Sequence, residues 1–275
     1  MTLILTCLTY DHILQVADRR LTLADGTLMV DDTNKAVFYC GRVAVSYTGP
    51  AQMEGKPTAE WIGWCMKDAS EIEPAMNQIA KQAEELFRKT NLYKFAVVAA
   101  GWATLRGAQP PLPYVAVASN FMTDSWNWED SPSEHMVVRA NFLPRNIPYF
   151  VFAAGQNLTA QEDAQLKRSV GRAVQSGTPA TSLAGLLGDA LRFIANGSDK
   201  RAKRIGKGMI IHLLSRKAAE EGRRDILAGL TPDAHSFLYI SSNDRTDPFQ
   251  GAVIACQGQL LTGFTGGSLP QGGRR

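Results

Sequence analysis

The stretch that decides the fold is residues 2–51, TLILTCLTYDHILQVADRRLTLADGTLMVDDTNKAVFYCGRVAVSYTGPA. Short apolar runs alternate here with turn residues, a pattern typical of β-strands joined by tight turns. The first run is apolar on both faces, so we expect a strand that is covered on both sides. Asp25-Gly26 is a hairpin signal. The stretch predicts strands at 2–10, 13–18, 35–39 and 42–47.

Beyond this stretch, two pairs of helices alternate with further strands. Apolar residues three and four apart predict the helices, with Thr58 as the expected cap of the first. Ser70–Glu73 and Thr159–Glu162 have the spacing of capping boxes. The helices are expected near 58–66, 70–87, 159–175 and 178–195. The later strands are expected at 95–100, 114–119, 147–154, 209–214, 236–240 and 251–256.

This order of elements predicts an α+β fold. We expect a four-layer αββα sandwich of two mainly antiparallel sheets, with one helix pair on each outer side. A doubly wound parallel sheet would need helices that alternate singly with strands, which this order does not provide. The chain is expected to form a single domain over 2–262, in which 216–262 adds extra C-terminal strands. Residues 263–275 are expected to be a flexible, Gly-rich tail.

Composition and charge exclude several function classes. The 275 residues are 45% hydrophobic and 20% charged, which is ordinary for a globular protein. A net charge of +3 does not make nucleic acid a default partner. No run of about 18 apolar residues predicts a membrane span, and the start of the chain lacks the basic segment of a signal peptide. We therefore expect a cytoplasmic protein with no nucleic-acid or membrane partner.

Metal and cofactor sites are also not expected. The cysteines are far apart in the sequence, and no two histidines have the spacing of a metal site. The sequence contains neither a Walker loop nor the elbow motif of serine hydrolases.

Thr2 is the first candidate catalytic residue. It follows Met1, and removal of an initiator methionine is expected before a small residue. A free Thr2 would carry a hydroxyl nucleophile and an α-amine in one residue, and such an amine can act as a base near neutral pH. Taken alone, a threonine at this position is an ordinary second residue.

Three further positions carry candidate groups. Asp18 ends the second strand within Ala17-Asp18-Arg19-Arg20, Lys35 opens the third strand, and Gly49 follows the fourth strand. A backbone amide at Gly49 can serve as an oxyanion donor. Taken singly, these positions have ordinary explanations, namely a surface ion pair, a solvated strand end and a simple turn.

Together, the four positions resemble the N-terminal nucleophile (Ntn) hydrolases of the proteasome β-subunit family. That family begins its mature chain with threonine, closes its second strand with Ala-Asp-x-Arg, opens its third strand with lysine and places a glycine after its fourth strand. The resemblance covers roughly residues 2–215. The matching segments are Thr2, Ala17-Asp18-Arg19-Arg20, Asn34-Lys35-Ala36-Val37-Phe38 and Tyr47-Thr48-Gly49-Pro50-Ala51.

The resemblance implies a threonine-type peptidase or amidohydrolase. Thr2 Oγ would attack a peptide carbonyl, and the Thr2 amine would take the proton. Lys35 would favour the alkoxide, and Asp18 would hold Lys35 charged and in place. The Gly49 amide would receive the oxyanion, and Arg20 would structure the loop around Asp18.

The resemblance also implies a substrate and an assembly. Leu21 and Thr22 would offer backbone hydrogen bonds to an extended peptide. Tyr47 and Ala51 would line the side-chain pocket, which the bulk of Tyr47 would narrow. The substrate would be a peptide or an unfolded protein, and the active sites would be enclosed in a homo-oligomeric ring. An ATPase or other regulatory partner is left open.

Two segments depart from the family's pattern. Where the family has Gly-Ser-Gly, with a serine that contacts the nucleophile, this chain has Gly155-Gln156-Asn157. Where the family has aspartate followed by Ser-Gly-Gly, this chain has residues 203–208, KRIGKG. Two alternatives therefore stay open: a proteasome-like ring or scaffold protein without peptidase activity, and an Ntn amidase that acts on a small non-peptide amide.

Overall fold

A five-stranded sheet contains the start of the chain. The computed structural model describes residues 2–22, 27–30, 33–40, 42–103, 111–217, 236–240, 253–256 and 258–262. The sheet order is β12-β1-β2-β13-β14, and every neighbouring pair is antiparallel. The strands are β1 Leu3–Thr9, β2 His12–Asp18, β12 Tyr149–Gly155, β13 Met209–Ser215 and β14 Ser236–Ile240.

A seven-stranded sheet has the order β11-β10-β9-β6-β5-β15-β16. All its pairs are antiparallel except β5 with β15, which is parallel. Two hairpins, β3–β4 and β7–β8, lie outside both sheets. The prediction of two mainly antiparallel sheets is confirmed. The strands are β3 Leu21–Thr22, β4 Leu28–Val30, β5 Ala36–Tyr39, β6 Val43–Thr48, β7 Gln52–Met53, β8 Lys56–Pro57, β9 Ala96–Ala103, β10 Leu112–Ser119, β11 Val137–Phe142, β15 Val253–Cys256 and β16 Gln259–Thr262.

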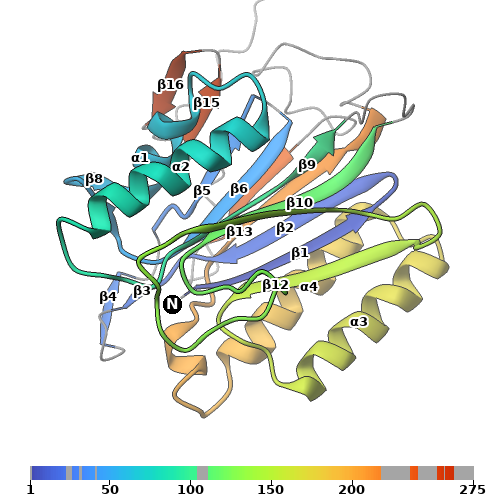
Figure 1. Cartoon of the computed structure of the whole chain (residues 1–275). Coiled ribbons are helices and arrows are strands. Elements are labelled where there is room, and N and C mark those ends of the chain that lie inside the picture. The colour runs from blue at the N-terminus through green and yellow to red at the C-terminus, as the bar shows by residue number, and fades with distance from the viewer. Residues whose placement is uncertain are drawn as a thin grey trace, which may run out of the picture.

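Helices lie in two pairs, and each pair packs on a different sheet (Figure 1). A first apolar cluster joins α1 and α2 to the seven-stranded sheet, and a third cluster joins α3 and α4 to the five-stranded sheet. A second cluster contains residues of both sheets, such as Ile4 and Val98, and so lies between them. The helices are α1 Thr58–Met66, α2 Ile72–Phe87, α3 Ala160–Gln175 and α4 Ala180–Ala195, followed by a short 3₁₀ helix, Ala202–Arg204.

Strand β1 shows how its sequence determines this packing. Side chains of a strand alternate between the two faces of the sheet. Ile4 and Leu8 enter the cluster between the sheets, whereas Leu3 and Leu5 enter the cluster under α3 and α4. All four are fully buried. The prediction of a strand covered on both faces is therefore confirmed.

Two predicted helix starts are wrong, and one is confirmed. Thr58 is the first residue of α1 rather than its cap, and its hydroxyl donates a hydrogen bond to the Pro50 carbonyl. Helix α2 begins at Ile72 without a side-chain cap, so Ser70 and Glu73 form no capping box. Thr159 and Glu162 form the expected capping box of α3.

The short strands β7 and β8 and the edge strand β11 were not predicted. Strand β16 lies within residues 216–262, where extra C-terminal strands were expected. The expected hairpin tip at Asp25-Gly26 and the expected tail 263–275 lie outside the described residues. None of the described helices has the length and apolar character needed to cross a membrane.

Candidate active site

The structure brings the hydroxyl of Thr2 against the ammonium of Lys35. Lys35 Nζ donates a hydrogen bond to Thr2 Oγ1 at 2.6 Å. Thr2 directly precedes β1 in one sheet, and Lys35 directly precedes β5 in the other. Thr2 is 2% exposed and Lys35 is 1% exposed. A positive charge held this close to a hydroxyl, in a site closed to water, favours the loss of the hydroxyl proton.

Asp18 is the counter-charge of Lys35. The two form a buried ion pair, with 3.4 Å between Lys35 Nζ and Asp18 Oδ1. The carboxylate also accepts three backbone N–H groups: Leu3 N to Oδ2 at 2.7 Å, Arg20 N to Oδ1 at 2.9 Å and Gly206 N to Oδ1 at 3.2 Å. A buried charge is stable only when it is paired and hydrogen-bonded, and Asp18 meets both conditions.

Arg20 meets the site through both its backbone and its side chain. Its carbonyl accepts a further hydrogen bond from Lys35 Nζ, and its side chain donates to the Lys203 carbonyl at 3.1 Å. Arg19 N donates to the Gly208 carbonyl at 3.0 Å. The segment 203–208, which departs from the family's pattern in sequence, therefore meets the Asp18 region through backbone groups.

Three residues that hold Thr2 were not predicted. Thr2 N donates to Thr48 Oγ1 at 3.0 Å, and the Thr2 carbonyl accepts from Gln156 N at 2.9 Å. Gly155 pairs with Leu3 across the strands β12 and β1. Gly155 has a φ of +83°, and a Cβ there would lie 2.0 Å from the Thr2 carbonyl oxygen. Glycine is therefore required at position 155 by both the conformation and the close approach.

The contact of Gly155 with the Thr2 carbonyl had one signal in the sequence, namely a glycine after a predicted strand. Gly155 was recognised as part of the departing segment Gly155-Gln156-Asn157, but its neighbour in space depends on the pairing of β12 with β1. Gln156 stands where the resemblance leads one to expect serine, and it reaches Thr2 through its backbone N–H.

Gly49 lies at the end of β6, directly after Thr48. Its φ is +144°, and a Cβ there would lie 2.8 Å from Phe95 Cδ2 and 3.0 Å from the Lys94 carbonyl oxygen. The position therefore admits only glycine. Since Thr48 contacts Thr2, the backbone of Gly49 lies at the same end of the sheets as the Thr2 hydroxyl.

The four predicted substrate-binding residues lie in different surroundings. Tyr47 is 1% exposed within the cluster under α1 and α2, and burial raises the pKa of its phenol. Ala51 is half-buried, and its carbonyl accepts from Thr58 N at 3.0 Å. Leu21 and Thr22 form the half-buried strand β3, which pairs with β4.

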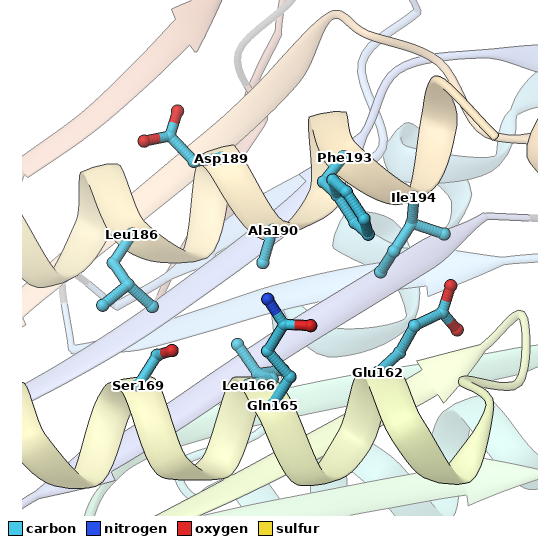
Figure 2. A pocket seen from close by; sticks show the side chains of 9 residues that line it. All are labelled: Glu162, Gln165, Leu166, Ser169, Leu186, Asp189, Ala190, Phe193 and Ile194. Carbon is cyan, nitrogen blue, oxygen red and sulfur yellow. The ribbon is translucent and has the colours of Figure 1, made fainter.

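A groove elsewhere on the molecule is distinct from the Thr2 cluster. It lies between α3 and α4 and has a volume of about 320 Å³ (Figure 2). Apolar side chains, including Leu166, Leu186 and Phe193, line most of it, and Glu162 and Asp189 add carboxylates. None of the residues around Thr2 lines this groove. Within the described residues, no group of three or more His, Cys, Asp or Glu side chains is placed to hold a metal ion.

The cluster defines a class of site: a buried threonine hydroxyl beside a buried ammonium–carboxylate pair. No protein-family model matches the chain, and no match is found among curated proteins. Solved structures do match the chain, among them the following two. The Gly-1 mutant of Anbu from Hyphomicrobium sp. strain MC1 has 10% identity and a TM-score of 0.47, over 78% of this chain and 82% of that one. Eukaryotic HslV from Trypanosoma brucei has 16% identity and a TM-score of 0.41, over 78% of this chain and 99% of that one.

Both TM-scores lie below 0.5 and both identities are low. The chemistry of this chain must therefore be argued from its own residues and their geometry.

Proposed function

We propose that this protein is a threonine-type Ntn hydrolase that cleaves peptide bonds, with Thr2 as the nucleophile. One observation carries the proposal: Thr2 Oγ1 lies 2.6 Å from Lys35 Nζ inside a buried cluster. A lysine that pairs with Asp18 for structural reasons alone has no need to contact a threonine hydroxyl at the start of the chain. The packing of two helix pairs on two sheets supports an αββα sandwich of the Ntn type.

The mechanism begins with removal of Met1, which leaves Thr2 with a free α-amine. Thr2 Oγ attacks the substrate carbonyl, and the amine accepts the hydroxyl proton. Lys35 stabilises the developing alkoxide, and Asp18 keeps Lys35 charged and in position. The Gly49 amide donates to the oxyanion. The leaving amine takes the proton, and water then hydrolyses the ester on Thr2.

The substrate is proposed to bind as an extended strand beside β3. In the described part of the chain β3 pairs with β4 on one side, and no strand pairs with its other edge. Leu21 and Thr22 would therefore have backbone groups available for a peptide. Ala51 and the ring of Tyr47 are proposed as the side-chain pocket, with Tyr47 closing its base. The working form is proposed to be a homo-oligomeric ring that limits access to unfolded chains.

Replacement of Thr2 tests the proposal. Thr2→Ala is expected to abolish hydrolysis of fluorogenic peptides, and Thr2→Ser is expected to retain part of it because a hydroxyl remains. Thr6→Ala is the matched control, because Thr6 is also buried on β1 but contacts Gln15 rather than Lys35. Intact-mass measurement of each variant establishes whether Met1 has been removed. Unchanged hydrolysis by Thr2→Ala would exclude Thr2 as the nucleophile.

A ring or scaffold protein without peptidase activity is the second candidate, and one observation favours it. Asp18 and Lys35 also bond the backbone at Leu3, Arg20 and Gly206, so the cluster would be useful for folding even without catalysis. This candidate predicts a wild-type protein that assembles but hydrolyses neither extended peptides nor small amides. Hydrolysis of small amides alone would instead indicate the amidase alternative.

A further inference from the structure

Thr48 makes the contact that holds the nitrogen of Thr2. The hydrogen bond from Thr2 N to Thr48 Oγ1 is 3.0 Å long, and Thr48 is only 1% exposed. Because water cannot easily reach a site this closed, the hydroxyl of Thr48 has no ready substitute as an acceptor.

The contact crosses between the two sheets. Thr2 leads into β1 of the five-stranded sheet, and Thr48 ends β6 of the seven-stranded sheet. Two residues earlier on β6, Ser46 donates to Gln15 Oε1 on β2 at 2.8 Å. Alternate residues of a strand share a face, so Ser46 and Thr48 both present a hydroxyl to the opposite sheet.

We infer that Thr48 is the positioning residue for the α-amine of Thr2, an inference that rests on the proposed function. The other polar groups of Thr2 are held separately, its hydroxyl by Lys35 and its carbonyl by Gln156 N. A free amine can rotate about its bond to Cα, and one N–H donated to Thr48 fixes that rotation. The nitrogen lone pair is then kept available for the proton of the Thr2 hydroxyl.

Thr48 also links the amine to the proposed oxyanion donor. Gly49 follows Thr48 directly, and its backbone is fixed by the close approach of Phe95 and the Lys94 carbonyl. One short segment thus holds both the group that takes the proton and the amide that receives the negative charge. The rate depends strongly on the alignment of these two groups with the substrate, since a displacement of about 1 Å can lower a rate by about 100-fold.

The test uses Thr48→Val, which keeps the shape of the side chain and removes the acceptor. Thr48→Ala is measured beside it, and Thr48→Ser is the conservative variant that keeps the hydroxyl. Thr6→Val is the matched control, since Thr6 is a buried threonine on β1 that does not contact Thr2. The readouts are kcat, KM and the pH dependence of kcat with a fluorogenic peptide, and the mass of each protein.

Thr48→Val and Thr48→Ala are expected to lower kcat by about 10- to 100-fold with little change in KM. The acidic limb of the kcat profile is expected to move to lower pH by about one unit, because the lost acceptor had favoured the protonated amine. The charged groups beside the amine, Lys35 and Asp18, are unchanged in these variants. Thr48→Ser is expected to restore most of the rate, and Thr6→Val to retain the wild-type profile. If Thr48 had a merely structural role, its substitution would lower kcat without moving the acidic limb of the pH profile.

A wild-type kcat and pH profile in both Thr48→Val and Thr48→Ala would overturn the inference and leave the proposed function standing. If the wild type hydrolyses nothing, the proposed function fails, and periodate oxidation tests the inference separately. Periodate cleaves a free amino alcohol through its neutral amine, so its rate against pH reports the amine of Thr2. If the pH profile of the oxidation rate lies at lower pH in Thr48→Val than in the wild type, the inference is supported. Coincident profiles, or a wild type that retains Met1, overturn it.

Discussion

Replacing Gly155 with alanine is the most demanding test of the geometry around Thr2. A Cβ at this position would lie 2.0 Å from the Thr2 carbonyl oxygen, whereas ordinary contacts begin at 3.4 Å. The Thr2 backbone would therefore have to move by more than about 1 Å relative to Gly155. A displacement of this size is expected to lower the rate of hydrolysis by about 100-fold.

Gly177 provides the matched control. Its φ is +68°, close to the +83° of Gly155, but a Cβ there would meet nothing within 4 Å. A left-handed conformation costs an alanine about 1–2 kcal/mol, of which about 0.4–1 kcal/mol is offset by the reduced entropy of the unfolded chain. Gly177→Ala should thus lose about 1 kcal/mol. Gly155→Ala adds an overpacking cost of about 1–3 kcal/mol.

Thermal unfolding measures the difference. At about 2–4 °C per kcal/mol for a chain of this size, Gly177→Ala is expected to lower the Tm by about 3 °C and Gly155→Ala by about 10 °C. Peptide hydrolysis is then compared at a temperature where both variants are folded. Equal Tm losses in the two variants, together with undiminished hydrolysis by Gly155→Ala, would refute the packing argument.

Three further changes test the charges and caps described above. Lys35→Met should lower the free energy of unfolding in urea by about 3–5 kcal/mol, because Asp18 is left buried without its counter-charge. Adding Asp18→Asn to this variant should recover part of the lost stability. If the losses of the two substitutions simply add, the pairing is contradicted. Burial lowers the pKa of His212 from 6.5 to about 4. In this pH range the unfolded chain therefore binds a proton that the folded chain does not. The free energy of unfolding should fall by roughly 3 kcal/mol as the pH drops from about 6.5 to about 4. His212→Leu should flatten this pH dependence, and an unaltered slope in that variant would contradict the role of His212. Thr159→Ala removes the capping box with Glu162 and should cost about 1 kcal/mol, with no change in peptide hydrolysis.

The core strands were accessible from the sequence because their signals are local, whereas the Lys35–Asp18 pair was expected only from the family resemblance. Apolar residues on both faces of 2–10 indicated a doubly covered strand, and β1 is one. The resemblance implied that Asp18 holds Lys35 beside Thr2, and in the structure Lys35 bonds both Thr2 Oγ1 and Asp18 Oδ1. Their catalytic roles stay a prediction.

Thr48 was not accessible, because its contact depends on how the two sheets stack. No spacing within 43–48 indicates that this hydroxyl, rather than that of Ser46, meets the chain start. Local signals also failed where tertiary contacts outweighed them. Threonine is a common N-cap residue, but the hydroxyl of Thr58 donates a hydrogen bond to the Pro50 carbonyl at the other end of the β7–β8 hairpin.

The parallel pairing of β15 with β5 has a consequence for any shortened version of the chain. Strand β5 begins immediately after Lys35, and its backbone is bonded by β6 on one side and by β15 on the other. Helix α1 packs closely on this added pair of strands, since a Cβ on Gly63 would lie 2.6 Å from Leu260 Cδ1. Truncation before residue 253 would leave β5 as an exposed edge strand next to Lys35. An exposed edge can pair with strands of neighbouring molecules. In the described part of the chain β16 is the outermost strand at this end, so the last strands place the free edge of the sheet two strands away from β5, which leads out of the site.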